Sequence, residues 1–446
     1  MYDDLMAWKG REHKSLLVKG QRQVGKTYII DKFGRDQYSC YRYFNFSENP
    51  VLHKVFEDAP NVEDIIKGLS VVSGERIEPG ALIFFDEIQE CPLARSSLKP
   101  FTIDGRYDVI ASGSLIGVNN SRLGADRPLM PMGYEEHMTM FSLDFEEFLW
   151  AKGIDVSTIN DVRRCIKDKR PILPAILSVF TDAFIDFMIV GGMPESVKSF
   201  IKTGNYSKSS DVKKEILDTC LNDINRYNKG LDIIKTSECF KCIPMQLADT
   251  NNKFIYSRVS GMKGRAAHNR YAENLLWIKE AGYGNFCYAT DGPILPLAAH
   301  TDRNNFKIYL SDTGLLVQMY GKETAKAIFL KETNYNNGAI VENVVAECLM
   351  KAGYVPRYYR KTNGNNRMEL DFVLEMGMGI CVIEVKSGKK RDAPSIEKVS
   401  KVFNIGRRVM LENGNISVDD DGIEHYPLFV AAFMKDLEPE WDGPEF

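Results

Sequence analysis

Long hydrophobic runs are missing from this chain. Its longest apolar stretches, such as "ALIFF" and "FMIV", fall far short of the roughly 20 residues that a helix needs to cross a bilayer. The first residues, "MYDDLMAWKGREHK", are acidic and then basic and have no apolar core, which does not fit a signal peptide. We therefore expect a cytoplasmic protein with no membrane partner.

No disulfide framework and no zinc motif stand out either. The nine cysteines are odd in number and scattered over 446 residues, which favours reduced thiols in a cytoplasm. Cys239 and Cys242 have the C-x-x-C spacing, but a zinc site would need a second pair or nearby histidines, and none follows at a suitable spacing. We interpret the pair as one turn of an amphipathic helix.

The net charge is small as well. The 57 Lys and Arg residues nearly balance the 61 Asp and Glu residues and leave a formal charge of −4. Any nucleic-acid site must therefore be a local basic patch. The apolar content of 44% and the charged content of 26% are ordinary for a globular protein, and the length predicts two or three domains.

Residues 15–150 contain alternating strand and helix patterns. The segments that we interpret as strands are "SLLVKG", "CYRYFNF", "ALIFFDE", "YDVIASGS" and "MTMFSL". "ALIFF" is apolar without a break, as expected for a strand buried on both faces of a parallel sheet. Segments such as "GKTYIIDKFG" have helical spacing between these strands. The predicted fold class of this part is α/β with a parallel sheet.

The rest of the chain changes pattern twice. Residues 151–235 are mostly helical, with a break at "VGGMPESV". Residues 236–320 predict helices followed by the strands "NFCYAT" and "NFKIYLSD", the outline of a winged helix. Residues 336–446 return to α/β, with the helix "AIVENVVAECLMKAG" and the strands "PRYYRK", "MELDFVLE" and "GICVIEVKSG".

The segment "GQRQVGKT" fits the phosphate-loop pattern G-x-x-x-x-G-K-T. A strand precedes it and a helix follows it, as the motif requires, and the helix N-terminus favours an anion. Lys26 would reach the β- and γ-phosphates, and the hydroxyl of Thr27 would help to hold Mg²⁺. The predicted ATP-binding residues of the loop are Gly20, Gln21, Arg22, Gln23, Val24, Gly25, Lys26 and Thr27.

Polar residues at the ends of two later strands complete this prediction. Asp86 ends "ALIFFD", where a P-loop protein needs a carboxylate for the Mg²⁺ shell, and Glu87 would orient the attacking water. Ser112 ends a third strand and would sense the γ-phosphate. Arg122 and Arg127 are candidates for a trans-acting arginine, or simply solvated loop arginines. The predicted cofactors are ATP and Mg²⁺.

Several motifs together resemble a large prokaryotic family of AAA-like ATPases, described as ATP-binding proteins with a C-terminal domain of unknown function. They are "GQRQVGKT", "FFDEIQECP", "ASGSLIGV", "FSLDFEEFLWAKG", "GGMPESV", "FKIYLSDTGLL" and "ELDFVLE…IEVKSG", in this order over nearly the whole chain. The resemblance implies a P-loop AAA-like ATPase domain at 1–150, a helical and winged-helix-like region at 151–325, and a domain similar to PD-(D/E)xK nucleases at 326–446.

In a site of that nuclease type, one acid lies on a strand and an E-x-K follows on the next strand. Asp371 and Glu384 would then ligate Mg²⁺. Lys386 lies two residues after Glu384, hence on the same face of its strand, where its ammonium could orient a water. Glu369 shares the face of Asp371 by the same spacing, and Glu342 on the preceding helix fits a supporting acid.

Two alternatives stay open for this region and for the middle of the chain. An E-x-K on an edge strand is also common as a solvated face, and a nuclease-like fold can serve only in binding. Residues 241–320 hold nine Lys or Arg against six Asp or Glu. They form either a DNA-phosphate footprint or a module that packs against protein, and the basic cluster comprises Lys253, Arg258, Lys263, Arg265 and Arg270.

Two hypotheses of function follow. The first is an ATP-hydrolysing enzyme that couples its nucleotide state to DNA binding or to metal-dependent DNA cleavage. The second is a signalling switch in which ATP controls assembly with a protein partner or as a homo-oligomer, and the nuclease-like domain only binds. Salt-dependent DNA affinity favours the first, and nucleotide-dependent oligomerisation without DNA binding favours the second.

Overall fold

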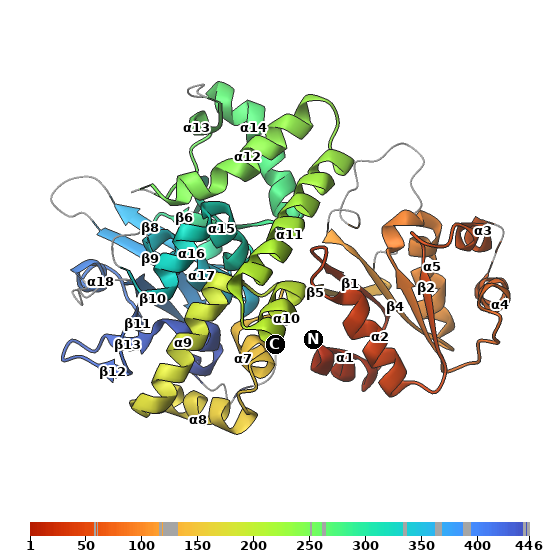
Figure 1. Ribbon diagram of the computed structural model, residues 1–446, viewed down its shortest axis with the longest axis horizontal. Coiled ribbons are helices and arrows are strands. Elements are labelled where there is room, and N and C mark those ends of the chain that lie inside the picture. Colours follow the sequence, from red (N-terminus) through yellow and green to blue (C-terminus); the bar gives the residue numbers. More distant parts are fainter. Residues whose placement is uncertain are drawn as a thin grey trace. The chain divides into compact units, whose positions relative to one another are not determined.

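The computed structural model describes residues 1–57, 59, 61–115, 118, 133–249, 252–260, 265–332, 337–361, 368–386, 394–439 and 443. The chain divides into two compact units. The first comprises Met1–Ser142 with Glu280–Gly282, and the second comprises Leu143–Lys279 with Tyr283–Phe446. Figure 1 labels the helices and strands of both units.

The first unit contains the predicted parallel sheet. Its strands are β1 (Ser15–Gly20), β2 (Tyr41–Asn45), β3 (Leu82–Asp86), β4 (Asp108–Ser114) and β5 (Glu135–Met140). They lie in the order β2-β3-β4-β1-β5, and every neighbouring pair is parallel. Strand β4 is therefore inserted between the strand before the phosphate loop and the strand that ends in Asp86. This arrangement confirms the sequence-based prediction.

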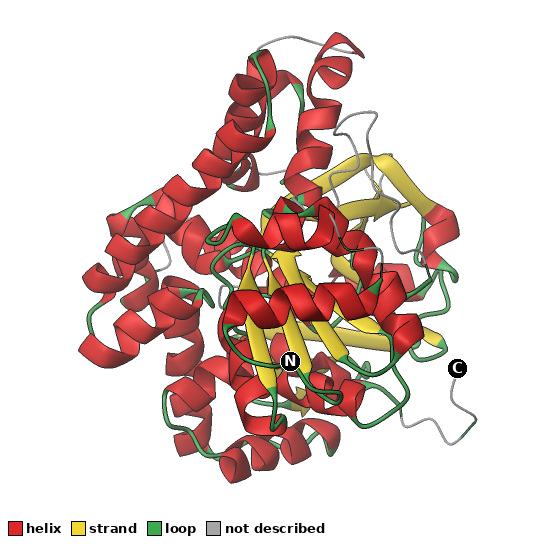
Figure 2. Cartoon of the chain, turned by 90° about the vertical axis from the view of Figure 1, so that its right-hand side faces the viewer, coloured by secondary structure: helices red, strands yellow, loops and turns green. Residues whose placement is uncertain are grey.

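Helices cover this sheet on both faces (Figure 2). The hydrophobic residues of β3 explain why, because Phe84 and Phe85 follow each other and point to opposite faces. Phe84 packs with α1 and α2, and Phe85 packs with α3, α4 and α5. The helical elements are α1 (Tyr2–Lys9), α2 (Lys26–Gln37), α3 (Val51–Glu57), α4 (Val62–Ser73), η1 (Ile88–Glu90) and α5 (Pro92–Asp104).

The second unit begins with a run of helices, as the sequence predicts for residues 151–235. They are α7 (Phe145–Ala151), α8 (Val156–Lys167), α9 (Pro174–Val190), α10 (Pro194–Thr203), α11 (Tyr206–Tyr227), α12 (Leu231–Leu247), α13 (Ser257–Ser260) and α14 (Arg265–Glu280). The later ones are η2 (Leu297–His300), α15 (Thr313–Tyr320), α16 (Lys322–Phe329), α17 (Asn337–Lys351), α18 (Pro394–Ser400) and η3 (Leu428–Leu437).

An eight-stranded sheet organises the rest of the second unit, in the order β12-β13-β11-β10-β9-β8-β6-β7. Strands β8, β9 and β10 are successively antiparallel, and β11 is parallel to β10. The strands are β6 (Gly284–Thr290), β7 (Thr301–Leu310), β8 (Arg357–Lys361), β9 (Met368–Met376), β10 (Gly379–Val385), β11 (Arg407–Glu412), β12 (Ser417–Val418) and β13 (Glu424–Pro427).

This division differs from the expected boundaries at 150 and 325. The backbone N–H of Leu143 donates to the carbonyl of Gly192 (2.8 Å), so α7 packs within the second unit. The hairpin β6–β7, which we expected as the tail of a winged helix, extends the C-terminal sheet because β6 pairs with β8. An isolated two-stranded hairpin is marginally stable, and pairing with β8 removes one of its open edges. The winged helix itself stays a prediction.

The motif "GGMPESV" has a structural role in this unit. Gly191 has φ +79°, and an added Cβ would lie 2.2 Å from Oδ1 of Asp312. The N–H of Gly192 donates to Oδ2 of Asp312 (2.8 Å), while Oδ1 accepts from the N–H of Leu315 and caps α15. The glycines are required because α9 ends directly against the start of α15.

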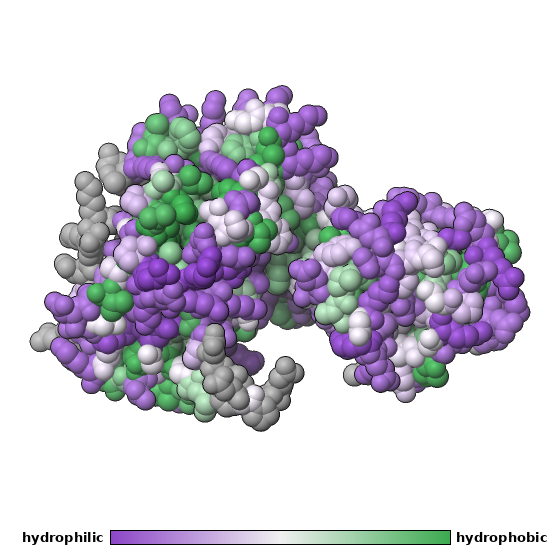
Figure 3. Space-filling view, turned by 90° about the horizontal axis from the view of Figure 1, so that it is seen from below, coloured by the Kyte–Doolittle hydropathy of each residue, from purple (hydrophilic) through white to green (hydrophobic). Residues whose placement is uncertain are grey.

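Hydrophilic residues dominate the view in Figure 3, with hydrophobic residues scattered between them. Among the described residues, none of the helices combines the length and the apolar content of a membrane span.

Candidate functional site

The phosphate loop has the local geometry that its sequence predicts. Strand β1 ends at Gly20 and helix α2 begins at Lys26. An added Cβ at Gly20 would lie 2.3 Å from the carbonyl oxygen of Met140, so a side chain is excluded there. Gly25 has φ +95° and begins the turn into α2, a conformation that favours glycine. The N–H groups at the N-terminus of α2 are suited to bind an anion at this loop.

Lys26 lies against this loop. Its Nζ donates to the carbonyl oxygens of Gly20 (3.1 Å) and Gln21 (2.7 Å). The side chain is buried, which holds the ammonium next to the loop backbone. A bound phosphate group would therefore meet a cation that is already in place.

Asp86 is the centre of the polar contacts at the ends of the strands. The residue is 3% exposed, and its Oδ2 accepts from the hydroxyls of Thr27 (2.8 Å) and Tyr43 (3.0 Å). Its Oδ1 accepts from the hydroxyl of Ser112 and from the N–H of Glu87 (3.1 Å). The structure thus brings together the three predicted residues Thr27, Asp86 and Ser112.

Tyr43 was not among the sequence-predicted site residues. Burial raises the pKa of its hydroxyl, and the Asp86 carboxylate raises this pKa further, so the hydroxyl stays protonated and donates. "CYRYFNF" indicated only a strand, because nothing in the local pattern shows that β2 lies next to β3.

Glu87 has an unusual backbone conformation for a residue with a side chain. Its φ is +54°, in the left-handed region that costs about 1–2 kcal/mol for residues other than glycine. Its carboxylate accepts a hydrogen bond from the side-chain amide of Gln89, which the sequence analysis did not single out. Strained conformations of this kind concentrate at functional sites. The predicted arginines Arg122 and Arg127 lie outside the described residues.

A second cluster of charged residues lies on one face of the sheet of the second unit. Ile383 of β10 pairs with Phe372 of β9, so Glu384 and Asp371 are neighbours in the next register position. The N–H of Val385 donates to Oδ2 of Asp371 (2.8 Å). The predicted pairing of these two acids is therefore present.

Glu384 has an incomplete set of hydrogen bonds. It is 8% exposed, and its Oε1 accepts from Nζ of Lys386 (2.6 Å). Its Oε2 is buried and has no hydrogen-bond partner within the described part of the chain. A buried carboxylate oxygen without a donor is costly, and it is the kind of atom that a cation would satisfy.

Glu342 reaches the same region from α17 but is held by other residues. Its Oε2 accepts from Nζ of Lys307 (3.1 Å) and from the hydroxyl of Tyr309 (3.0 Å), and its Oε1 accepts from the side-chain amide of Asn252 (2.9 Å). Lys307 is 1% exposed. The predicted role of Glu342 as a metal ligand therefore competes with an existing ion pair.

Burial and crowding of like charges dominate the electrostatics of the cluster. Burial raises the pKa of Asp371 well above its usual range, and the charges of Glu342 and Glu384 raise it further. Burial also raises the pKa of Glu384, against the opposing effect of Lys386. Burial lowers the pKa of Lys307, but Glu342 and Asp371 outweigh this effect, so its pKa is raised and it stays charged.

The described residues contain no group of three or more His, Cys, Asp or Glu side chains positioned to hold a metal ion. The magnesium site at Asp371 and Glu384 stays a prediction. Among the described residues Glu384 has a buried oxygen without a hydrogen-bond partner, whereas both oxygens of Glu342 accept hydrogen bonds. Glu369 faces Arg360 across β8 and β9, at 3.5 Å from Oε2 to Nε.

The predicted basic cluster of the middle region has separate partners. Arg258 pairs with Asp249, and Nζ of Lys253 donates to Oδ1 of Asn305 (3.0 Å) in the C-terminal sheet. Arg270 is exposed on α14, above the ring of Tyr271. Lys263 and the side chain of Arg265 lie outside the described residues. The DNA footprint stays a prediction.

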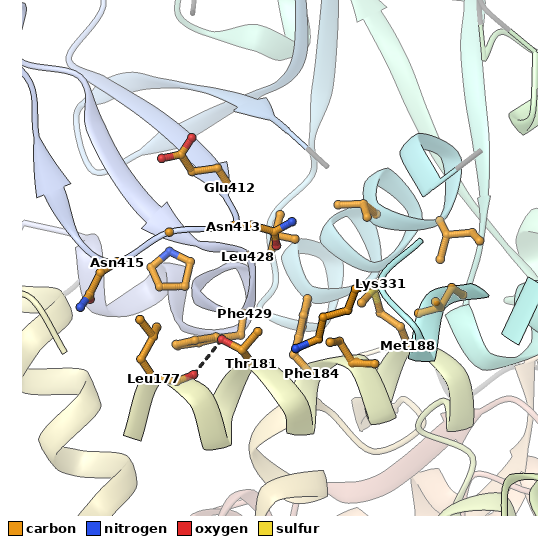
Figure 4. Close-up of a pocket in the computed structure, with 16 residues that line it drawn as sticks. Leu177, Thr181, Phe184, Met188, Lys331, Glu412, Asn413, Asn415, Leu428 and Phe429 are labelled. Carbon is orange, nitrogen blue, oxygen red and sulfur yellow. Dashed lines mark hydrogen bonds between the residues drawn. The ribbon is translucent and has the colours of Figure 1, made fainter. Parts of the chain in front are cut away.

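A large apolar cavity lies elsewhere in the second unit (Figure 4). Its volume is about 600 Å³, and Leu177, Phe184 and Met188 of α9 form one wall opposite Phe429. None of the predicted site residues lines it.

Cys239 and Cys242 lie within α12, where the thiol of Cys242 donates to the carbonyl of Cys239 (3.2 Å). The helix-turn interpretation of this pair is confirmed.

Family models match three parts of the chain. Residues 12–149 match an AAA domain, residues 181–326 match a "Domain of unknown function (DUF8612)", and residues 337–429 match a "Domain of unknown function (DUF4143)". No curated protein matches the chain. Residues 12–149 therefore form an AAA-like P-loop ATPase domain, in agreement with the geometry of the phosphate loop.

Two solved structures show a distant similarity. A Walker-type ATPase of Pyrococcus abyssi is 12% identical over 72% of this chain and 94% of its own, with a TM-score of 0.44. The RuvB Holliday junction branch migration motor of Thermotoga maritima is 12% identical over 63% of this chain and 84% of its own, with a TM-score of 0.29.

Proposed function

We propose that the first unit binds and hydrolyses ATP with Mg²⁺. The observation that supports this most strongly is the set of contacts at Asp86, which accepts from Thr27 of the phosphate loop and from Ser112 of β4. Three separate elements meet there at one carboxylate. In P-loop ATPases these positions hold the metal and sense the γ-phosphate, and here they are already adjacent.

Each residue then has a distinct task. The backbone N–H groups of the loop and of α2 bind phosphate oxygens, and Lys26 neutralises the charge that develops between the β- and γ-phosphates. Thr27 and Asp86 would hold Mg²⁺, which supplies further neutralisation of the phosphate oxygens. Glu87 accepts a hydrogen bond from the attacking water and orients it toward the γ-phosphorus. The water oxygen then bonds to the γ-phosphorus as the bond to the bridging oxygen breaks, the water's proton passes to a γ-phosphate oxygen, and ADP and phosphate leave.

The test is ATP binding and turnover by Lys26→Ala. This variant removes the ammonium that contacts both carbonyls of the loop and should lose affinity and hydrolysis together. Lys32→Ala is the matched control, because Lys32 lies on the same helix and its ammonium pairs with Asp36 at the surface. Wild-type turnover by Lys26→Ala would refute the assignment.

We propose a second function for the second unit, metal-dependent hydrolysis of a nucleic-acid phosphodiester. The specific observation in its favour is the buried, unpartnered Oε2 of Glu384 next to Asp371. These two carboxylates would hold Mg²⁺, which polarises the scissile phosphate. Lys386 would orient the water that adds to phosphorus, while the leaving oxygen departs and takes a proton from solvent.

Cleavage of labelled single-stranded and duplex DNA, with Mg²⁺ or Mn²⁺ and with or without ATP, tests this second function. Lys386→Ala should abolish cleavage and leave ATP hydrolysis intact, since the two sites belong to different units. If the wild type cuts no DNA and binds none, and ATP instead changes its oligomeric state, the chain is a nucleotide-controlled assembly switch.

A further inference from the structure

A polar pocket lies where β6, β7 and β8 adjoin in the second sheet. Its volume is about 390 Å³, and the residues that matter here are Lys253, Asn305, Tyr358, Arg360 and Lys361. Cationic side chains outnumber carboxylates around it, since the acids that line it are Asp291 and Asp302. A concave site with converging cations is suited to an anionic ligand.

The cations of this pocket have partial counter-charges, because Arg360 lies 3.5 Å from Oε2 of Glu369 and Asp302 lines the pocket. Both oxygens of Asp302 accept hydrogen bonds, from the N–H of Asn304 (2.9 Å) and from the side-chain amide of Asn305 (2.5 Å). Burial lowers the pKa of Lys253 and the nearby charge of Arg360 lowers it further, although the carboxylates of Asp302 and Glu369 oppose this shift. Two cations thus lie close enough to repel each other, and an anion between them would relieve that repulsion.

Tyr358 gives an independent indication of a ligand. The residue is 1% exposed, and its hydroxyl has no hydrogen-bond partner within the described residues. Buried hydroxyl groups are nearly always paired in proteins. Its ring lies beneath Nζ of Lys307, 5.3 Å from the ring centre, and an oxygen acceptor that reaches the buried hydroxyl would complete its hydrogen bonding.

The two carboxylates lie on β9 and β10, the two strands that follow β8 in the sheet. Arg360 of β8 is paired with Glu369 of β9, and Asp371 lies two residues further on the same face. The register between β8 and β9 shifts next to Tyr358, a kind of irregularity that re-aims side chains at functional sites. From β8 to β10 is two strand spacings, about 10 Å. Figure 1 shows β8, β9 and β10 side by side.

We propose that this pocket binds a phosphate group of a nucleic-acid strand that extends to Asp371 and Glu384. The proposal rests on the phosphodiester hydrolysis proposed above, for which it supplies a substrate-positioning subsite. Lys253, Tyr358 and Arg360 all donate hydrogen bonds, and phosphate oxygens only accept them. A strand covers about 10 Å in roughly three nucleotides, at the 3.4 Å rise per nucleotide of B-DNA.

The experiment measures binding in EDTA, so that nothing is cut. Fluorescence anisotropy follows a short labelled single-stranded DNA, with or without a 5′-phosphate, on wild type, Tyr358→Phe and Lys253→Ala. Tyr358→Phe removes only a hydroxyl that no described residue uses, so the fold is kept and the dissociation constant should rise about tenfold. Lys253→Ala should also lower the log–log salt slope by roughly 0.7. Arg303→Ala, an exposed cation on β7, is the matched control and should bind like wild type.

The outcomes separate the pocket from the hydrolysis. If the wild type prefers the DNA with a 5′-phosphate and Tyr358→Phe loses this preference, the ligand is a terminal phosphate. If Tyr358→Phe weakens the binding of both DNAs equally, the ligand is an internal phosphate. Wild-type affinity of Tyr358→Phe, or an equal loss in Arg303→Ala, overturns the pocket. A parallel cleavage assay with Mg²⁺ tests the hydrolysis separately. If Tyr358→Phe weakens DNA binding but the wild type cuts no DNA, the phosphate pocket is supported and the hydrolysis is refuted. If the wild type cuts DNA but Tyr358→Phe binds DNA normally, the hydrolysis is supported and the pocket is refuted.

Discussion

Replacing Asp371 by asparagine is expected to stabilise the metal-free protein at neutral pH. Its carboxylate lies beside Glu384 and near Glu342, while Lys307 is the nearby cation on β7. Asparagine keeps an oxygen that can accept from the N–H of Val385 and removes the charge. Removing one of several crowded carboxylates relieves their repulsion, and a pKa rise of one unit that is relieved corresponds to about 1.4 kcal/mol. A gain of this order corresponds to a melting temperature a few degrees higher.

The pH dependence has a defined sign. The pKa of Asp371 is raised in the folded protein, mainly by burial and then by Glu342 and Glu384. Its contribution to stability is therefore fully present below the unfolded pKa of about 3.9 and is lost as the pH rises through the folded pKa. The gain in the free energy of unfolding from Asp371→Asn should thus be small near pH 4 and largest at neutral pH.

With added Mg²⁺ or Mn²⁺, the wild type should become more stable than Asp371→Asn. Wild type gains about 2.7 kcal/mol at a metal concentration one hundred times the dissociation constant, and Asp371→Asn gains much less. Thermal unfolding of both proteins in EDTA and in metal measures this. The control Asp420→Asn, at an exposed position, should change neither transition. If Asp371→Asn is less stable than wild type in both conditions, Asp371 is a structural residue and the metal site is refuted.

The other predictions concern the remaining charged residues. Lys307→Met leaves a buried carboxylate without its cation and should lower the free energy of unfolding, measured with urea, by about 3–5 kcal/mol. The control Lys331→Met removes an exposed lysine and should lower this free energy by less than about 1 kcal/mol. Replacing both Arg265 and Arg270 by alanine should weaken the binding of all DNA sequences alike. If the slope of log affinity against log salt concentration is unchanged, these arginines contact protein instead. Lys386→Ala should bind DNA but not cut it in a gel assay, and residual cutting would exclude its ammonium from the reaction.

The sequence predicted those features that depend on neighbouring residues. Gly25 of "GQRQVGKT" and the continuous run "ALIFF" are recognisable from local sequence, because the first allows a turn with positive φ and the second is apolar without a break. The two-residue spacing of Glu384 and Lys386 was likewise enough to place them on one face. Such patterns need no knowledge of the rest of the fold.

The features that were missed depend on which strands become neighbours. Tyr43 reaches Asp86 only because β2 lies beside β3. Lys307 and Tyr309 reach Glu342 only because the hairpin β6–β7 joins the C-terminal sheet. A signal for Lys307 did exist, since it is a lone lysine in the apolar strand "FKIYL".

The central claim about this protein is that Glu87 orients the attacking water in ATP hydrolysis. Glu87→Gln retains the phosphate loop, Lys26 and Asp86, and loses the carboxylate that orients the attacking water. The decisive measurement is steady-state ATP turnover alongside equilibrium ATP binding, with the exposed Glu78→Gln as the matched control. The account predicts wild-type ATP affinity with turnover reduced at least a hundredfold in Glu87→Gln, and unchanged behaviour of Glu78→Gln. Wild-type turnover by Glu87→Gln would contradict it.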